Sequence, residues 1–554
     1  MTTDKNTFDF IIAGGGSAGC VLANRLSEDP TVSVCLLEAG GKDKSPLIRV
    51  PLGIMFLIDS KEYNYRYRTS EQTHASNRNI RIPRGRTLGG SSSINGMVYS
   101  RGHPLDYDEW ANAAGCHGWS YGEVLPYFKR SENNETFPGD PYHGTGGPLH
   151  VSNIKKPNRL VDVLFEATDS LQIPRREDFN ADEQEGVGFR QVTIKNGKRH
   201  SAAAAYLDPV KHRPNLTVMT DSIADKVTME GKRVTGIEII QAGEHKTIFA
   251  NREVIIACGT IVSPAVLMRS GIGDPAELQK HGIEVRHRLD NVGKNLQEHA
   301  AANLVMKSPS IASYGFSVRA VPHLTWHVFD YILNRVGLLA SNVNEATVFS
   351  RSLPGLDRPD IQLGFTPALR TSTGRKVTYG HGISMNASIL RPKSRGTISL
   401  KDADPMSAPV IDPNFFSIED DLDTMVRAVK LGRRILGSPA FDPYRGEELK
   451  PGKDVQTDAQ FAQYVRDNSA TVFHPVGTCA MGSGDDTVVD PALKVKGLEG
   501  LRIVDASVMP LLIGGNTNAP TMMIAEKAAD MILGKPPLPT YLPDDYPHKT
   551  TQAA

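Results

Sequence analysis

One stretch near the N-terminus limits the fold more than any other part of the chain. Residues 8–13, FDFIIA, are apolar enough for a buried strand, and the run GGGSAG follows at 14–19. A helical pattern then continues to Leu26, and a second apolar strand, VSVCLLE, ends at Glu38. A strand, a glycine turn, a helix and a second strand within about 30 residues are the arrangement of a dinucleotide-binding unit. The sequence therefore predicts an α/β domain that binds a dinucleotide.

Three glycines and one acid of this unit have separate tasks. Gly14 makes the tight turn, Gly16 lets the backbone approach a pyrophosphate, and Gly19 lets the helix and strand pack closely. The N-terminus of the helix presents free N–H groups to the phosphates. Glu38 stands where a carboxylate accepts hydrogen bonds from a ribose hydroxyl. Because a carboxylate there disfavours a 2′-phosphate, the pattern argues against NADP.

The bulk properties narrow the range of partners. With 554 residues, the chain is long enough for two domains or for one domain with large insertions. Lysine plus arginine equals aspartate plus glutamate at 62 each, so the net charge gives no reason to bind nucleic acid or an anionic membrane. Small molecules are therefore the expected partners.

Several features favour a reducing compartment. The five cysteines are scattered, which argues against a disulfide framework. The N-terminus enters the strand at 8–13 without the basic and apolar parts of a secretion signal. No stretch of 18 uncharged apolar residues occurs. We therefore expect a cytoplasmic protein.

The segment TVFHPVGTCAMG at 471–482 permits several interpretations of His474. A metal site would need further ligands at recognisable spacings, and none lies nearby, so no metal is expected. A nucleophilic Cys479 would need an activating environment, whereas free cysteines are commonly buried packing residues. A lone histidine is often structural. The residues alone leave a structural role and a catalytic base open.

Four segments together resemble the glucose-methanol-choline (GMC) oxidoreductases. The resemblance spans nearly the whole chain and is greatest to a choline-dehydrogenase-like branch that includes alcohol and polyethylene glycol dehydrogenases. The segments are GGGSAG with Glu38, GRTLGGSSSIN at 85–95, GTIVSPAVLMRSGIG at 259–273, and HPVGT at 474–478 with GNTNAPTMMIAE at 515–526.

The resemblance implies an α/β (α+β) fold with two interleaved domains. One is a Rossmann-like FAD-binding domain, and the other is a substrate-binding domain built on an antiparallel sheet. Short strand patterns at 210–260 and alternating apolar runs at 303–410 fit this organisation. The expected FAD-binding segments are 1–155, with a flavin-covering loop at 84–102, 201–305 and 481–536; the substrate-binding segments are 156–200 and 306–480, and 537–554 form a tail.

The cofactor implied by the resemblance is FAD. Its ADP part would contact the glycine unit and Glu38, the loop would cover the flavin, and the segment near residue 505 would close over the pyrophosphate. Members that attach FAD covalently carry a histidine where Ile94 stands, so a noncovalent cofactor is expected. The expected cofactor-binding residues are Gly14, Gly16, Ser17, Ala18, Glu38, Leu88, Gly89, Asn95, Gly96, Met97, Val98, Val227, Asp505 and Ala506.

The resemblance also implies a reaction. The catalytic pair of the family is a histidine followed 44 residues later by histidine or asparagine, and His474 and Asn518 have this separation. His474 would accept the proton of a primary alcohol as hydride passes to flavin N5, and Asn518 would hold the oxygen. The product is an aldehyde, and the electrons pass to a quinone or another acceptor. An alcohol oxidase using dioxygen, a choline dehydrogenase and a non-redox FAD-containing lyase are the alternatives.

The remaining substrate-binding residues are less constrained. Tyr314, Phe316, Trp326 and Phe329 either line the substrate entrance or belong to an ordinary core. Glu345 is the only acid we nominate for binding the ammonium group of choline. Peripheral association with an inner membrane is compatible with a quinone acceptor, although no amphipathic basic helix is evident. The sequence carries no signal for the oligomeric state.

Overall fold

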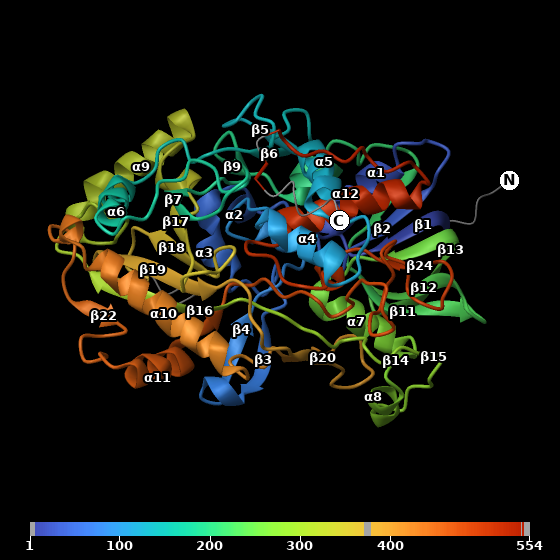
Figure 1. Ribbon diagram of the computed structural model, residues 1–554. Coiled ribbons are helices and arrows are strands. Elements are labelled where there is room, and N and C mark those ends of the chain that lie inside the picture. The colour runs from blue at the N-terminus through green and yellow to red at the C-terminus, as the bar shows by residue number, and fades with distance from the viewer. Residues whose placement is uncertain (1–5, 371–377, 545, 548–554) are drawn as a thin grey trace.

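Two sheets of seven strands each lie on opposite sides of the molecule (Figure 1). The computed structural model describes residues 6–370, 378–544 and 546–547. Both sheets are assembled from segments far apart in the chain, so neither belongs to one continuous stretch of sequence. No helix in these described ranges has the length and hydrophobicity needed to cross a membrane.

The first sheet has a parallel centre extended by an antiparallel meander. Its order is β10-β2-β1-β13-β12-β11, and β24 pairs with β13. The long strand β13 joins the two parts, because its first half pairs antiparallel with β12 and its second half pairs parallel with β1. The strands are β1 (Thr7–Ala13), β2 (Val34–Leu37), β10 (Leu216–Met219), β11 (Ser222–Glu230), β12 (Arg233–Gln241), β13 (Glu244–Ile256) and β24 (Leu501–Ile503).

Helices pack around this sheet and around one another. The expected helix after the glycine turn is α1 (Ser17–Leu26), and it packs on α12 (Asn518–Ile532), which lies about 500 residues later in the sequence. α12 also packs on α5 (Tyr121–Ser131), and α7 (Gly259–Arg269) packs on β11. Shorter helices before residue 281 are α2 (Pro46–Arg49), α3 (Ile54–Leu57), α4 (Pro104–Asn112) and α8 (Pro275–Lys280).

The second sheet is antiparallel throughout. Its order is β22-β16-β19-β18-β17-β7, with β23 on β16. The apolar face of α10 (Glu419–Leu436) covers it, with α6 (Leu160–Asp169) and α11 (Asp458–Asn468) packed beside that helix. The strands are β7 (Gly186–Phe189), β16 (Ala300–Lys307), β17 (Ala346–Ser350), β18 (Ile361–Thr366), β19 (Gly382–Ile389), β22 (Glu448–Lys450) and β23 (Ala470–Thr471).

One expected domain boundary needs correction. The division between residues 305 and 306 falls inside β16, which pairs with β19 from Ala301 to Lys307. Because the ladder is continuous, the whole strand belongs to the second sheet. The other strands of the two sheets lie within the segments assigned to them. The described part of the proline-rich tail is extended and packs on α5, where the Tyr541 N–H donates to the Gly122 carbonyl at 2.9 Å.

The glycine turn shows why its spacing is so restrictive. Gly14 has φ +113°, and a Cβ there would lie 2.4 Å from the Ala257 carbonyl oxygen. A Cβ on Gly19 would lie 1.8 Å from the Gly14 carbonyl oxygen. A Cβ on Gly16, in contrast, would meet no atom within 4 Å. Gly14 and Gly19 are therefore required by the fold, whereas the space beside Gly16 is left open.

This difference gives a paired prediction for stability. Gly19→Ala should lower the free energy of unfolding of the apoprotein by about 1–3 kcal/mol, because the added methyl group overpacks the α1–β1 contact. Gly16→Ala, the matched control, should change it by less than about 0.5 kcal/mol. Denaturant unfolding followed by circular dichroism measures both values. Equal destabilisation by the two substitutions would contradict this account.

Candidate active site

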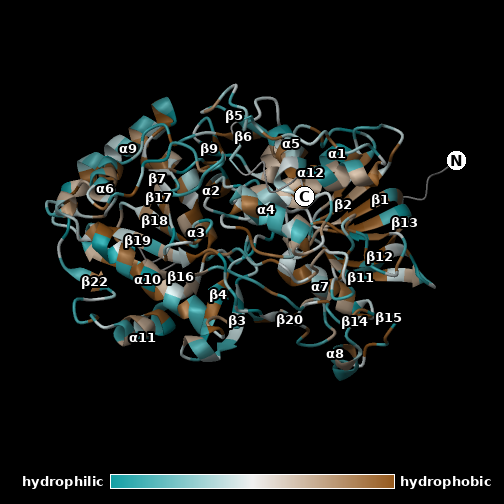
Figure 2. Cartoon of the chain, in the orientation of Figure 1, coloured by the Kyte–Doolittle hydropathy of each residue, from teal (hydrophilic) through white to brown (hydrophobic). Residues whose placement is uncertain are grey.

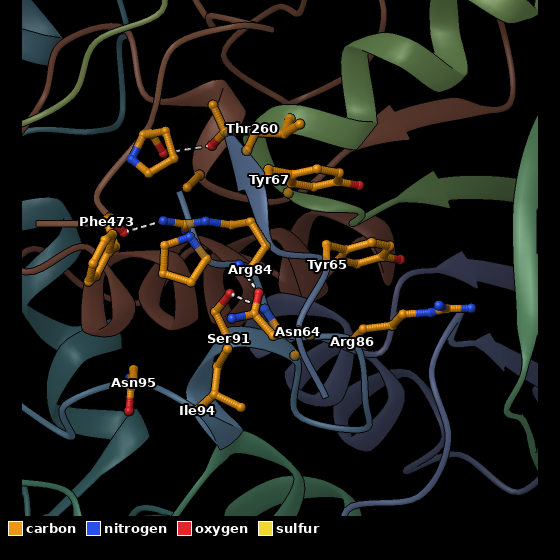
Figure 3. Close-up of a pocket in the computed structure, with 18 of the residues that line it drawn as sticks. Asn64, Tyr65, Tyr67, Arg84, Arg86, Ser91, Ile94, Asn95, Thr260 and Phe473 are labelled. Carbon is orange, nitrogen blue, oxygen red and sulfur yellow. Dashed lines mark hydrogen bonds between the residues drawn. The ribbon is translucent and has the colours of Figure 1, made fainter. Parts of the chain in front are cut away.

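A cavity of about 920 Å³ lies where the two sheets approach each other. One end is lined by the β1–α1 turn and by the N-termini of α1, α7 and α12. The other end is lined by strands β16, β18 and β19 of the second sheet. The close-up in Figure 3 shows part of the wall between these ends, where Arg84 reaches the Phe473 carbonyl and Tyr65 stacks on Tyr67.

The first end has the features that a dinucleotide requires. Glu38 accepts hydrogen bonds from the N–H groups of Gly15 at 2.9 Å and Gly40 at 2.8 Å, which fix its carboxylate at the cavity wall. Burial raises the pKa of Glu38 to about 7, although both hydrogen bonds act in the opposite direction. The open space beside Gly16 faces the same cavity. A carboxylate acceptor beside an open glycine backbone fits a ribose and a pyrophosphate.

Helix N-termini meet at this end. The Ser17 hydroxyl at the start of α1 donates to Asn518 Oδ1 at the start of α12, at 2.7 Å. The Asp505 carboxylate accepts from the Gly259 N–H at 2.8 Å and the Ser263 hydroxyl at 2.6 Å, both in α7. Helix N-termini carry partial positive charge, so α1 and α12 create a favourable environment for phosphate and other anionic groups.

The loop at 84–102 lies against the cavity, as expected, and crosses to the second sheet. Asn95 Oδ1 accepts from the buried Arg199 at 2.8 Å and from the Met97 N–H at 3.0 Å. The Gly96 carbonyl accepts from Asn342 at 2.7 Å. Met97 adopts φ +56°, which turns the chain sharply along the cavity. These contacts hold the loop as a rigid wall between the two domains.

Most of the expected cofactor-binding residues line the cavity, and three do not. Leu88 and Gly89 lie behind the glycine turn, where the Gly89 N–H donates to the Gly15 carbonyl at 2.7 Å. Val227 is fully buried, and β11 lines the cavity through Ser222–Ala224 instead. The residues found on the wall are Gly14, Gly16, Ser17, Ala18, Glu38, Asn95, Gly96, Met97, Val98, Asp505 and Ala506.

His474 is held by a chain of hydrogen bonds that determines its tautomer. His299 Nε2 lies 2.9 Å from the Leu390 carbonyl, which only accepts, so this nitrogen carries a proton. His299 Nδ1 is then an acceptor, and it lies 3.0 Å from His474 Nδ1, which must be the donor. His474 Nε2 therefore carries no proton, and its electron pair acts as an acceptor on the cavity side. The arrangement is that of a neutral base aimed into the cavity.

The amide beside this electron pair belongs to Asn516. Its Nδ2 donates to His474 Nε2 at 2.9 Å, and its buried Oδ1 has no partner. Asn518, the residue expected at this position from the 44-residue spacing, also lines the cavity but bonds to Ser17. Asn516, rather than Asn518, is therefore the asparagine that contacts His474 in the structure. Sequence reasoning missed Asn516, His299 and the arginines Arg84 and Arg190, because only their positions in the fold connect them to His474.

The charges around His474 keep it neutral. Burial, His299 and the cations Arg84 and Arg190 hold the pKa of His474 well below its ordinary value of 6.5. Burial also lowers the pKa of His299 to about 4. Glu298 anchors the backbone by accepting from the His474 N–H at 2.7 Å. At neutral pH both imidazoles are therefore uncharged, in agreement with the hydrogen-bond chain.

The acid and the aromatic residues considered for substrate binding do not line the cavity. Glu345 is fully buried and accepts from the Asn158 N–H, the Ser341 hydroxyl and the Tyr314 hydroxyl, so it is a structural acid away from the cavity wall. Tyr314, Phe316, Trp326 and Phe329 are also absent from the wall. Trp326 and Phe329 are 60% and 55% exposed, which excludes an ordinary core position.

Comparison with known proteins identifies the family. Residues 8–301 and 392–525 match the N-terminal and C-terminal parts of the GMC oxidoreductases. An alcohol dehydrogenase (acceptor) of Pseudomonas putida is 46% identical, covering 95% of this chain and 96% of the relative. An oxygen-dependent choline dehydrogenase of Brucella ovis is 42% identical, with 96% of each chain covered. The chain belongs to the GMC oxidoreductase family.

Two solved structures are similar to this chain over nearly its whole length. Pyridoxine 4-oxidase from Mesorbium loti is 32% identical with a TM-score of 0.86, covering 96% of this chain and 100% of that one. Formate oxidase from Aspergillus oryzae is 28% identical with a TM-score of 0.88, covering 96% and 99%. The protein is therefore an oxidoreductase with FAD as its cofactor, and the predicted fold class is confirmed. The ribose acceptor Glu38, the open Gly16 and the helix N-termini fit this cofactor.

The cofactor attachment can be tested directly. Ile94 is buried on the cavity wall at the position where covalent members of the family carry a histidine. We expect acid or heat denaturation to release all the FAD into the supernatant after the protein is removed. Absorbance of the supernatant and of the washed pellet measures the two fractions. Flavin that stays with the pellet, or a peptide carrying flavin in mass spectrometry, would contradict the expectation.

Proposed function

We propose that the protein oxidises a primary alcohol to an aldehyde, with His474 as the base. The observation that carries this proposal is the unprotonated Nε2 of His474, whose tautomer is set by His299 and whose electron pair accepts from Asn516 at the cavity. The partner of Nε2 in the structure is the Asn516 amide, which can turn to another acceptor when an alcohol binds.

In the proposed reaction FAD, when bound, supplies the acceptor for a hydride. His474 Nε2 takes the proton from the alcohol oxygen, while its Nδ1–H keeps its hydrogen bond to His299 Nδ1. The Asn516 amide donates a hydrogen bond to that oxygen once it turns from His474. This role was expected of Asn518, and the contact with His474 moves our proposal to Asn516. Asn518 instead joins α12 to α1 beside the cofactor.

A histidine base alone cannot supply the free energy needed to form an alkoxide. An alcohol with a pKa near that of water, about 16, lies about 9 units above an ordinary histidine, which corresponds to about 12 kcal/mol for a free alkoxide. The lowered pKa of His474 increases this difference. Proton transfer must therefore be coupled to hydride departure, or the developing negative charge must be stabilised in the cavity. Asn516, Arg84 and Arg190 are the groups that provide such stabilisation.

The electron acceptor in our proposal is a quinone or another acceptor rather than dioxygen. The Pseudomonas putida relative, named as an acceptor-dependent alcohol dehydrogenase, supports this assignment. We further propose that the enzyme works in the cytoplasm, which the five free cysteines support, and that it associates peripherally with the inner membrane. A choline substrate is disfavoured, because the acids that line the cavity among the described residues, Glu38 and Asp505, both lie at the dinucleotide end.

Three alanine substitutions separate the proposed roles. His474→Ala should leave FAD bound but slow its anaerobic reduction by alcohol by about 10²–10⁴-fold, because the base is lost. Asn516→Ala should slow it by about 10²–10³-fold, as expected for one donor to the reacting oxygen. Asn518→Ala should mainly weaken FAD retention, because its contact is with Ser17. Stopped-flow flavin absorbance and flavin content after gel filtration measure the two effects.

The same series can contradict the proposal. A His474→Ala protein reduced at the wild-type rate would exclude His474 as the base. Slow reduction in Asn518→Ala together with normal reduction in Asn516→Ala would restore the original assignment of Asn518. If no alcohol reduces the flavin of the wild-type enzyme, alcohol oxidation itself is excluded.

A further inference from the structure

Arg190 is a buried cation without a carboxylate partner. It follows β7, is 7% exposed and lies on the cavity wall. Its Nη2 donates to the Thr347 hydroxyl at 3.0 Å, and its Nε has no partner. In the described part of the chain no acid forms an ion pair with it, and burial lowers its pKa to about 10, so it is still charged at neutral pH. A buried, uncompensated guanidinium is unfavourable unless a ligand supplies the missing charge.

The surrounding backbone leaves room for this side chain. A Cβ on Gly364 of β18 would lie 2.7 Å from Arg190 Nη2 and 3.0 Å from Asn344 Nδ2. The absence of a side chain at Gly364 therefore lets both groups lie against the sheet. The Asn344 Oδ1 is also buried without a partner. Two unsatisfied polar side chains meeting at one point of a cavity wall indicate a ligand rather than a structural role.

The rest of this end of the cavity is polar as well. The second sheet contributes amides and a hydroxyl, and Arg370 lies on the same wall. Within the described ranges, the acids that line the cavity are Glu38 and Asp505, which lie at the dinucleotide end and accept hydrogen bonds from backbone N–H groups. The lining residues from β16, β18 and β19 are Asn303, Gln362, Asn386 and Ser388.

We propose that the alcohol substrate carries a carboxylate, which Arg190 binds while the hydroxyl faces His474. The inference rests on the proposed function, because it names the substrate class of that same site. Arg190 and His474 line the same cavity, so one small molecule can contact both groups. A guanidinium binds a carboxylate through paired hydrogen bonds and repels a quaternary ammonium group. The expected substrates are hydroxycarboxylates, and choline is disfavoured.

The test compares matched substrates by anaerobic flavin reduction. ω-Hydroxyalkanoates should exceed 1-alkanols of equal chain length by about ten- to a hundredfold in kcat/KM, as expected for a hydrogen-bonded charge. Arg190→Gln should remove this ratio, and Arg190→Lys should retain part of it. Arg86→Gln, which removes a charge from the other end of the cavity, should preserve the ratio. Flavin content shows that each variant is folded.

A binding measurement supports the kinetics without turnover. A simple alkanoate such as butyrate should perturb the flavin absorbance of the wild-type enzyme, and the perturbation should be lost in Arg190→Gln. A wild-type enzyme that prefers the 1-alkanols, or an Arg190→Gln protein that keeps the carboxylate preference, would overturn the inference while leaving alcohol oxidation intact. A preference for hydroxyalkyl phosphates over carboxylates would overturn the choice of carboxylate. Failure of every alcohol to reduce the flavin would instead refute the proposed function.

An independent observation concerns α9 (Val321–Asn334), which exposes its apolar side chains to solvent and buries polar ones. This helix buries His327, Asp330 and Tyr331, and most of its apolar side chains face outward. Leu333 is 76% exposed and Trp326 is 60% exposed. The helix lies at the edge of the molecule (Figure 1) and carries hydrophobic stretches along its length (Figure 2). The α9 apolar surface comprises Phe316, Val318, Val321, Trp326, Val328, Phe329, Ile332, Leu333 and Tyr379.

The exposed charged side chains within residues 311–340 are positive. Arg319 and Arg335 are exposed at the two ends of the helix. Asp330, the only acid between residues 311 and 340, is buried and bonds to Lys156 at 2.6 Å. A second copy packed on this surface would bring arginines together, whereas anionic headgroups would pair with them. Exposed aromatic and aliphatic side chains flanked by arginines are typical of helices that lie in the membrane interface.

This surface adjoins the cavity wall. The 3₁₀ turn Leu338–Ala340 contacts both α9 and the turn Pro51–Gly53. The residues that follow these two turns, Asn342 and Ile54, line the cavity. We infer that the α9 apolar surface lies in the interfacial layer of an anionic bilayer. The sequence had shown no amphipathic basic helix, because the pattern of α9 resembles an ordinary buried helix until its orientation is known.

Vesicle binding tests this second proposal, independently of the reaction. The holoenzyme should sediment with phosphatidylglycerol-containing vesicles and much less with phosphatidylcholine vesicles. Trp326 reports insertion, because the other tryptophans, Trp110 and Trp119, are fully buried. Its fluorescence should shift to the blue and become protected from acrylamide. The double substitution Phe329→Ser/Leu333→Ser should abolish sedimentation with the vesicles.

The control is Leu353→Ser/Ile418→Ser, which removes two apolar side chains that are 46% and 45% exposed elsewhere on the surface. This variant should bind vesicles like the wild type. Wild-type protein that stays in the supernatant, or equal binding by both double variants, would overturn the proposal. Sedimentation velocity that shows a dimer dissociated by Phe329→Ser/Leu333→Ser would assign the surface to a second copy of the chain instead.

Discussion

The Leu390 carbonyl fixes the chemistry of the whole site, because it decides which nitrogen of His299 carries a proton. From that choice the tautomer of His474 follows, and with it the absence of a proton on Nε2. This series of hydrogen bonds connects four segments: the end of β19, the segment before β16, the loop before Pro475 and the loop before α12. Four parts of the sequence must therefore be folded together before a base exists.

Around this neutral base the environment is cationic. Arg84 and Arg190 lie near His474, and the N-termini of α1 and α12 lie at the cofactor end of the cavity. Such an environment disfavours the imidazolium and favours negative charge on a reacting oxygen or a bound ligand. The same positive charges that weaken His474 as a base in isolation thus stabilise the anion formed when the proton leaves. In our proposal His474 serves as the base, whereas other groups stabilise the negative charge.

The sequence predicts the cofactor end of the site better than the substrate end. The glycine turn and Glu38 are a local pattern whose spacing is dictated by backbone contacts, and Gly14, Gly16 and Glu38 all lie on the cavity wall. Asn516 and Asn518 are two positions apart at a helix start, and only the fold decides which side chain faces His474. On β11, likewise, Ala224 lines the cavity and Val227 does not, and no local sequence pattern shows which part of the strand faces the cavity. Burial of Glu345 and exposure of Trp326 depend on packing of distant segments.

The most direct test of the central claim is neutron diffraction from deuterium-exchanged crystals of the oxidised enzyme at neutral pH. The account predicts deuterium on His299 Nε2 and on His474 Nδ1, and none on His474 Nε2. Deuterium on His474 Nε2, or on both nitrogens of that ring, would show that the electron pair assigned to the base does not exist in the resting enzyme.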